Sequence, residues 1–240
     1  GIAVGVSLYS DSEKTISNDQ IYRTEHATLF NDGVATPMVD EQEWLSSVAK
    51  SINNNNIAVG AANKVINGAT RSKMFYFDYN TNQTVYVDGF FSSSSTVANA
   101  INDNNQVVGR GEVIIGGTTT RRQHGFILDI SSGDFKDLNQ LITCSSPYTV
   151  VEAKDINNNG VILATAIVSK EQRDLNGEAV LDNAGNPVMA EVAVAVKLEP
   201  VANGDVEDCS TEQTEYEREG GSAGFGSLLI GLLLWWRRKA

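Results

Sequence analysis

The chain has 240 residues, with 18 Lys or Arg against 30 Asp or Glu, which gives a formal net charge of −12 at pH 7. A nucleic acid would be repelled by this charge, so the composition argues against nucleic-acid binding. The length is sufficient for one sizeable hydrophobic core.

A short pattern recurs along the chain, with copies that begin at Ala49, Ala98 and Ala153. Each copy reads Ala-x-x-Ile-Asn, continues with Asn-rich residues and ends in an apolar triplet. Asn and Gly tolerate positive φ, so each copy predicts two strands joined by a tight turn. Residues 1–5 match only the second half of the pattern, from which we expect the chain to be the C-terminal part of a longer protein.

A second apolar run, divided by turn residues, lies near His26, Lys73 and His124 and predicts a further hairpin in each repeat. The fourth copy, at Val192, lacks a clear return strand. Two hairpins in roughly 50 residues are typical of a propeller blade. The sequence therefore predicts an all-β fold, a propeller-like array of about four 4-stranded antiparallel blades that belongs to a larger propeller. A β-solenoid or a stacked sandwich is the alternative.

The predicted β-repeat domain spans residues 1–204, with blades at about 1–43, 44–92, 93–143 and 144–200. The only two histidines, His26 and His124, occupy equivalent repeat positions. Equivalent positions of repeats usually have equivalent structural roles, so we expect a structural rather than a catalytic function for both.

These repeats resemble those of the extracellular HAF-repeat proteins, which are named for a His-Ala-Phe step. The step stands here as His26-Ala27-Thr28 and as His124-Gly125-Phe126. The resemblance implies an extracellular location and a β-repeat shape, and it implies no particular activity.

One Asn-rich turn matches the start of a calcium-binding loop, with Asp155, Asn157 and Asn159 as the candidate ligands. The pattern requires Glu at the twelfth loop position, where this chain has Ala166. Turn chemistry explains all three copies, whereas calcium would explain only one. We therefore expect no metal and no cofactor, with calcium at this loop as the alternative.

Residues 205–219 are acidic and predict a solvated spacer between the repeats and the C-terminal tail. The chain has two cysteines, Cys144 and Cys209. In an exported protein a disulfide between them is expected, and two unpaired thiols are the alternative.

Residues 220–240 form a tail with a glycine pair, an apolar run and a basic end. A helix of residues 222–236 would be about 22 Å long, shorter than the roughly 30 Å of a hydrocarbon core. The positive-inside rule places the basic end in the cytoplasm and the rest of the chain outside it. The residues of this predicted signal are Gly220, Gly221, Trp235, Trp236, Arg237, Arg238 and Lys239.

This tail resembles the GlyGly-CTERM sorting tail of Gram-negative bacteria. The resemblance implies export machinery and rhombosortase, a rhomboid-type intramembrane protease, as partners. It also implies that the short C-terminal hydrophobic helix holds the chain in the inner membrane only until cleavage, after which the protein is surface-attached or secreted. A permanent membrane anchor is the alternative.

The sequence contains no nucleophile elbow, phosphate loop or dinucleotide-binding fingerprint. We therefore predict an exported protein with a structural or ligand-binding role, whose ligand would be a surface glycan or a protein. The alternative is an extracellular hydrolase that acts on a polysaccharide or another polymer, because the pairing of carboxylates in space cannot be read from a sequence.

Overall fold

The computed structural model describes residues 1–16, 20–114, 120–202, 204 and 206. Within these ranges the regular structure is β-strand, apart from one turn of 3-10 helix, η1 (Leu138–Gln140). The prediction of an all-β fold is therefore confirmed. The predicted C-terminal helix lies outside the described residues.

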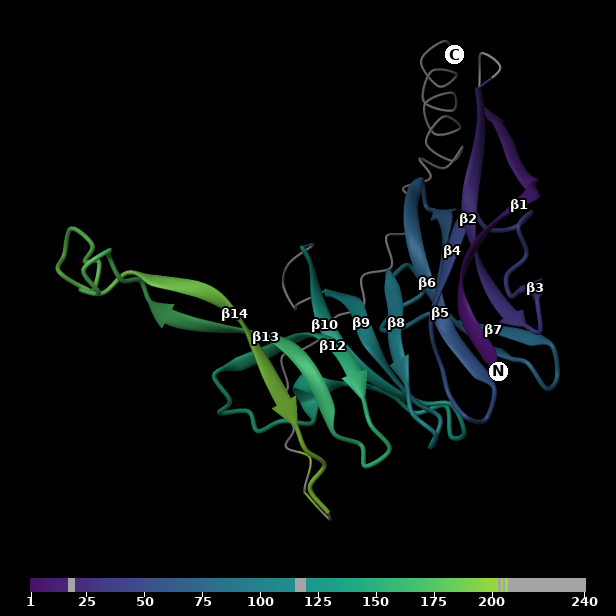
Figure 1. The fold of residues 1–240 in the computed structure, drawn as a ribbon. Helices are drawn as coiled ribbons and strands as arrows, with labels where there is room; N and C mark the ends of the chain where they lie inside the picture. Colours follow the sequence, from purple (N-terminus) through teal and green to yellow (C-terminus); the bar gives the residue numbers. More distant parts are fainter. Residues whose placement is uncertain (17–19, 115–119, 203, 205, 207–240) are drawn as a thin grey trace, which may run out of the picture.

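The strands form four antiparallel sheets that follow one another along the chain (Figure 1). The first sheet contains β1 (Ile2–Ile16), β2 (Gln20–Asn31) and β3 (Val34–Pro37). The second contains β4 (Ser46–Ile52), β5 (Ile57–Ile66), β6 (Ala69–Asp78) and β7 (Gln83–Val87). The third contains β8 (Thr96–Ile101), β9 (Gln106–Ile114), β10 (Arg121–Asp129) and β11 (Phe135–Asp137). The fourth contains β12 (Tyr148–Ile156), β13 (Ile162–Glu171) and β14 (Met189–Leu198).

The first and fourth sheets have three strands each, where the repeat pattern predicts four. In the first sheet β1 takes the place that β5 and β9 have in theirs. Among the described residues, this sheet therefore lacks a strand equivalent to β4 and β8. In the fourth sheet β14 is followed by Glu199 and Pro200, and proline cannot donate to a β ladder. We call β4, β8 and β12 the leading strands.

The hydrophobic core consists of three layers, one between each pair of successive sheets. Side chains alternate between the two faces of a strand, so one strand serves two layers. Ala58 of β5 packs toward the first sheet, and its neighbour Val59 packs toward the third. In the same way, Val107 of β9 packs toward the second sheet and Val108 packs toward the fourth. Each leading strand contacts the preceding sheet, β4 on β1 and β2, β8 on β5 and β6, and β12 on β9 and β10.

Each leading strand carries a bulge one residue after its alanine. The alanine pairs with Gly60 in the second sheet and with Gly109 in the third. A Cβ atom on Gly60 would lie 1.9 Å from the carbonyl oxygen of Val48, and one on Gly109 would lie 2.0 Å from that of Val97. Glycine is thus required where the two strands approach closely. In the fourth sheet Ala164 pairs with the alanine in place of glycine. There the leading strand has a second register shift, between Val150 and Glu152, which the other two leading strands lack.

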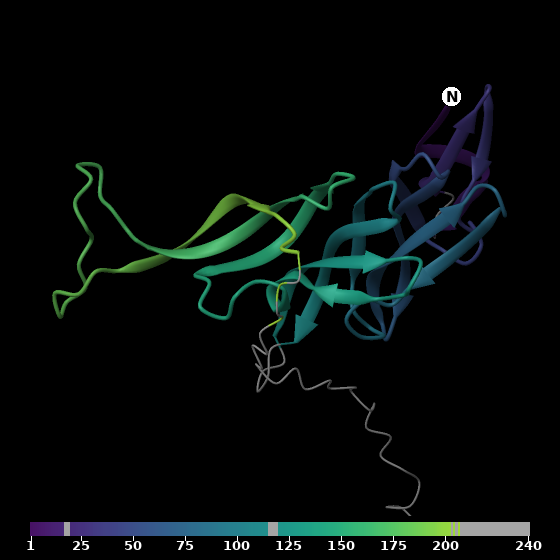
Figure 2. The ribbon, with the colours of Figure 1, turned by 90° about the horizontal axis from the view of Figure 1, so that it is seen from below.

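Among the described residues, the fourth sheet leaves one face uncovered. In the fourth sheet the side chain of Leu163 is 51% exposed, although the residues at the same repeat position, Val59 and Val108, are fully buried. Both views show the long β13–β14 hairpin extending away from the other sheets (Figures 1 and 2). Its far end is held by two isolated bridges, Arg173 to Ala179 and Leu181 to Pro187.

Candidate functional site

The residue at the His position of each repeat is buried or nearly buried in the first three sheets. It is His26 in β2, Lys73 in β6 and His124 in β10. Nε2 of His26 lies 2.9 Å from the hydroxyl oxygen of Thr24. In the fourth repeat the position is taken by Val192 of β14, which is exposed.

Lys73 and His124 each pair with an aspartate that follows or ends the last strand of their sheet. Nζ of Lys73 lies 2.9 Å from Oδ1 of Asp88, and it also donates to the backbone carbonyl of Ser92. Nδ1 of His124 lies 2.6 Å from Oδ2 of Asp137. Burial of an unpaired cation is costly, so Asp88 and the carbonyl of Ser92 stabilise the interior position of Lys73. The structural role that the sequence suggests for His26 and His124 stays a prediction.

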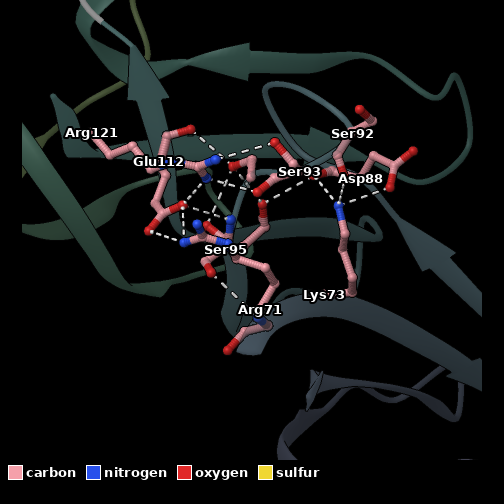
Figure 3. A network of polar contacts seen from close by, with 11 residues as sticks. Arg71, Lys73, Asp88, Ser92, Ser93, Ser95, Glu112 and Arg121 are labelled. Atoms are coloured by element: carbon pink, nitrogen blue, oxygen red, sulfur yellow. Dashed lines mark hydrogen bonds and ion pairs between the residues drawn. The ribbon is translucent and has the colours of Figure 1, made fainter. Parts of the chain in front are cut away.

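A network of charged residues joins the second and third sheets at this end of the molecule (Figure 3). Oε2 of Glu112, on β9, lies 2.5 Å from Nη1 of Arg121 and 3.4 Å from Nη1 of Arg71. The same oxygen accepts the backbone N–H of Ser95 at 3.1 Å. Arg121 also donates to the backbone carbonyl of Ser93 at 2.7 Å. Glu112 and Arg121 therefore hold the serine-rich loop between β7 and β8 through their hydrogen bonds to Ser95 and Ser93.

The Asn-rich turns form a ladder at the opposite ends of the strands. In each turn one asparagine accepts two backbone N–H groups, those of the residues two and four positions later. These asparagines are Asn53, Asn102 and Asn157. The side-chain amide of Asn53 donates to the carbonyl of Asn102 at 3.0 Å, and that of Asn102 donates to the carbonyl of Asn157 at 3.0 Å. The turns thus bond both internally and to the next sheet.

A second row of bonds runs beside this ladder through Asp103. Its carboxylate accepts the backbone and side-chain N–H groups of Asn54 and the side-chain amide of Asn158. These hydrogen bonds, that from the Asn54 backbone first, lower the pKa of Asp103 below the usual value for Asp. The predicted tolerance of positive φ is also observed, at Asn56, Asn105 and Gly160.

The calcium-loop candidates are occupied by turn contacts. Oδ1 of Asn157 accepts the N–H groups of Asn159 and Val161, both at 3.0 Å, and Oδ1 of Asp155 accepts that of Ile156 at 2.9 Å. Within the described ranges no group of three or more His, Cys, Asp or Glu could hold a metal ion.

The residues that form the bulges add a third set of links between sheets. Nζ of Lys50 donates to Oδ1 of Asn99 at 2.9 Å, and Nδ2 of Asn99 donates to the carbonyl of Ala153 at 2.8 Å. Asn99 also donates to Glu152 at 3.0 Å. Burial raises the pKa of Glu152, but the hydrogen bonds from Lys154 and Asn99 outweigh it and the pKa lies below the usual value.

The remaining predicted site residues lie largely beyond the part of the chain that the structure describes. Cys144 lies between η1 and β12, but Cys209 does not belong to the described residues, so their disulfide stays a prediction. The tail residues from Gly220 to Lys239 also fall outside. In the described part, no helix is both long and apolar enough to span a membrane.

Sequence reasoning missed the acidic partners and the arginine network. Asp88 and Asp137 follow their basic partners by different spacings, and Arg71, Glu112 and Arg121 belong to no repeated pattern. The available signal was Lys73, which stands in place of a histidine directly before the apolar run of residues 74–77 and implies a nearby acid.

A family model described as "Protein of unknown function (DUF3466)" matches residues 1–239 of the chain. No curated protein and no solved structure matches it.

Proposed function

We propose that this chain, which belongs to the DUF3466 family of proteins of unknown function, is an exported, surface-attached or secreted β-repeat protein with a structural or ligand-binding role. The proposal rests on how the polar residues of the repeats are used. It gives the chain no catalytic step.

The main support is that the repeated polar side chains bind one another across sheets. Asn53, Asn102 and Asp103 link three successive turns. Lys73 and His124 are each bound to an aspartate. The asparagine and Asp103 bonds join neighbouring sheets, and the two aspartate pairs fix strands within one sheet, which are roles expected of shared residues in repeat proteins.

An assay of polymer hydrolysis separates this proposal from the hydrolase alternative. The chain would be incubated with a panel of polysaccharides and release of reducing ends measured, beside a glycan array that reports binding. We expect no turnover. Turnover that is lost in Glu112→Gln or Asp137→Asn, with the fold retained, would contradict the proposal, because a glycosidase depends on its carboxylates.

The four sheets are, in this proposal, successive blades of a propeller-like array. Support comes from the meander order of strands in each sheet and from the packing of each leading strand on the preceding sheet. A crystal structure of the exported protein would check this. Leading strands that surround a common axis are expected, and leading strands in a straight row would exclude a propeller.

Export depends on the tail of residues 220–240, for which rhombosortase and the export machinery are the proposed partners. The support is the sequence pattern of glycine pair, apolar run and basic end. Mass spectrometry of the mature, surface-located protein is expected to find no peptide from residues 228–236. Recovery of that peptide from the mature protein would instead indicate a permanent anchor.

A further inference from the structure

Two cations, Lys50 and Arg110, lie close together where the second and third sheets meet. Lys50 is the bulged residue of β4, and Arg110 lies on β9, directly after Gly109. Both side chains reach solvent. Partial burial lowers the pKa of Lys50, and the positive charge of Arg110 lowers it further. The fold thus holds two like charges near enough to repel each other.

Neither cation forms a hydrogen bond to an acid within the part of the chain that the structure describes. The ammonium of Lys50 donates to a neutral group, Oδ1 of Asn99, at 2.9 Å. Nε of Arg110 lies 3.9 Å from Oε1 of Glu152, which is too long for a hydrogen bond. An ammonium and a guanidinium each carry several N–H donors. Most of these donors therefore remain available to water or to a ligand.

The acid nearest to Arg110, Glu152, is shared with other groups. Its Oε2 lies 2.6 Å from Nζ of Lys154, and its Oε1 accepts the side-chain amide of Asn99 at 3.0 Å. The charges that act on Lys50 are those of Arg110, Lys154 and Glu152. With Lys50 itself, three positive charges thus stand against one negative charge, an excess of two. The chain as a whole has a formal net charge of −12, so this cluster opposes the overall charge.

We propose that Lys50 and Arg110 bind a divalent tetrahedral oxyanion, phosphate or sulfate, which bridges the second and third sheets. A phosphate monoester carries a charge of about −1.5 to −2 at pH 7, which matches the local excess of positive charge. Its oxygens accept charge-assisted hydrogen bonds from the ammonium and the guanidinium. A long polyanion is a poorer ligand, because it would extend over a chain with more acids than bases. This site does not depend on the proposed export of the protein.

The test is isothermal titration calorimetry of the full 240-residue chain with sodium phosphate at constant ionic strength. We expect saturable binding with a Kd of about 1 mM or tighter. Lys50→Gln and Arg110→Gln should each weaken binding about fivefold or more, because each removes one charge-assisted contact. The matched control is Lys136→Gln, which removes the same charge from an exposed lysine outside the cluster. It should bind phosphate within about twofold of the original chain.

A second titration with glycerol phosphate distinguishes the two sources of the anion. Binding as tight as that of inorganic phosphate would assign the site to a phosphate monoester of a small molecule, and binding of inorganic phosphate alone would assign it to the free ion. Either result supports the site. The variants should remain folded, since the replaced side chains are exposed, and thermal unfolding in chloride buffer would verify this.

Three results would overturn the proposal. The first is the absence of saturable phosphate binding up to about 10 mM, since an affinity that weak lies below that of a specific site. The second is unchanged binding by Lys50→Gln or by Arg110→Gln. The third is equal weakening by Lys50→Gln and Lys136→Gln, which would show that the overall charge attracts the anion and that no defined site does.

Discussion

The interior sheets differ from the end sheets in what surrounds them, although all are built from one repeat. Val108 in the third sheet is fully buried, and its counterpart Leu163 in the fourth is 51% exposed. Gly109 lies close to a leading strand, whereas Gly5 has no leading strand beside it among the described residues. The residue at a given repeat position is therefore suited to contact a neighbouring sheet or strand, and its contribution to stability depends on whether that sheet or strand is present.

The largest contrast is expected between Gly109→Ala and Gly5→Ala. The first places a methyl group 2.0 Å from the carbonyl oxygen of Val97 and should cost about 4 kcal/mol of unfolding free energy, or abolish folding. The second should stabilise the chain by about 0.5 kcal/mol, because alanine restricts the unfolded backbone more than glycine does. Urea unfolding measures both, and equal costs would remove the distinction between interior and end sheets.

A smaller contrast is expected between Val108→Ala and Leu163→Ala. Val108 lies in the core between the third and fourth sheets, so its truncation leaves a cavity and should cost about 2 kcal/mol. Leu163 is half-exposed, and its truncation should cost less than about 0.5 kcal/mol. Chemical denaturation of the two variants side by side tests this. A large cost at Leu163 would mean that its face is covered in solution.

The asparagine ladder gives the next contrast, between Asn102→Ala and Asn157→Ala. Asn102 is buried and bonds its own turn and the next one, so its loss should cost about 1.5 kcal/mol. Asn157 is exposed, and water can replace its bonds, so about 0.5 kcal/mol is expected. Unfolding midpoints at neutral pH provide the measurement. A greater loss at Asn157 would contradict the ladder as described.

The smallest effect concerns Asp103, whose pKa is lowered in the folded state. A lowered pKa means that the carboxylate stabilises the fold above its unfolded pKa and that this contribution is lost as the pH falls through the folded value. Stability should therefore fall slightly on acidification below the usual carboxyl range. Asp103→Asn should show a shallower decline over the same range in a series of urea titrations. An identical decline in both proteins would exclude Asp103 as a source.

The repeat pattern made part of this fold predictable. Ile101, Asn102 and Asn105 recur at fixed spacing in other copies, and they mark a strand, a capped turn and a residue with positive φ. The network around Glu112 was not predictable, because Arg71 and Arg121 belong to different strands whose approach depends on how two sheets pack. The missing leading strand of the first sheet, by contrast, agrees with the half pattern at residues 1–5.

The asparagine ladder has a direction, since Asn53 donates forward to the turn of Asn102, and Asn102 donates forward to the turn of Asn157. Each unit thus offers one donor to its successor and one acceptor to its predecessor. Duplication of a whole unit within the coding sequence would lengthen the row by one rung and leave no buried amide without a partner. Insertion of half a unit would break it. Lineages of this protein should therefore vary in length by complete repeats.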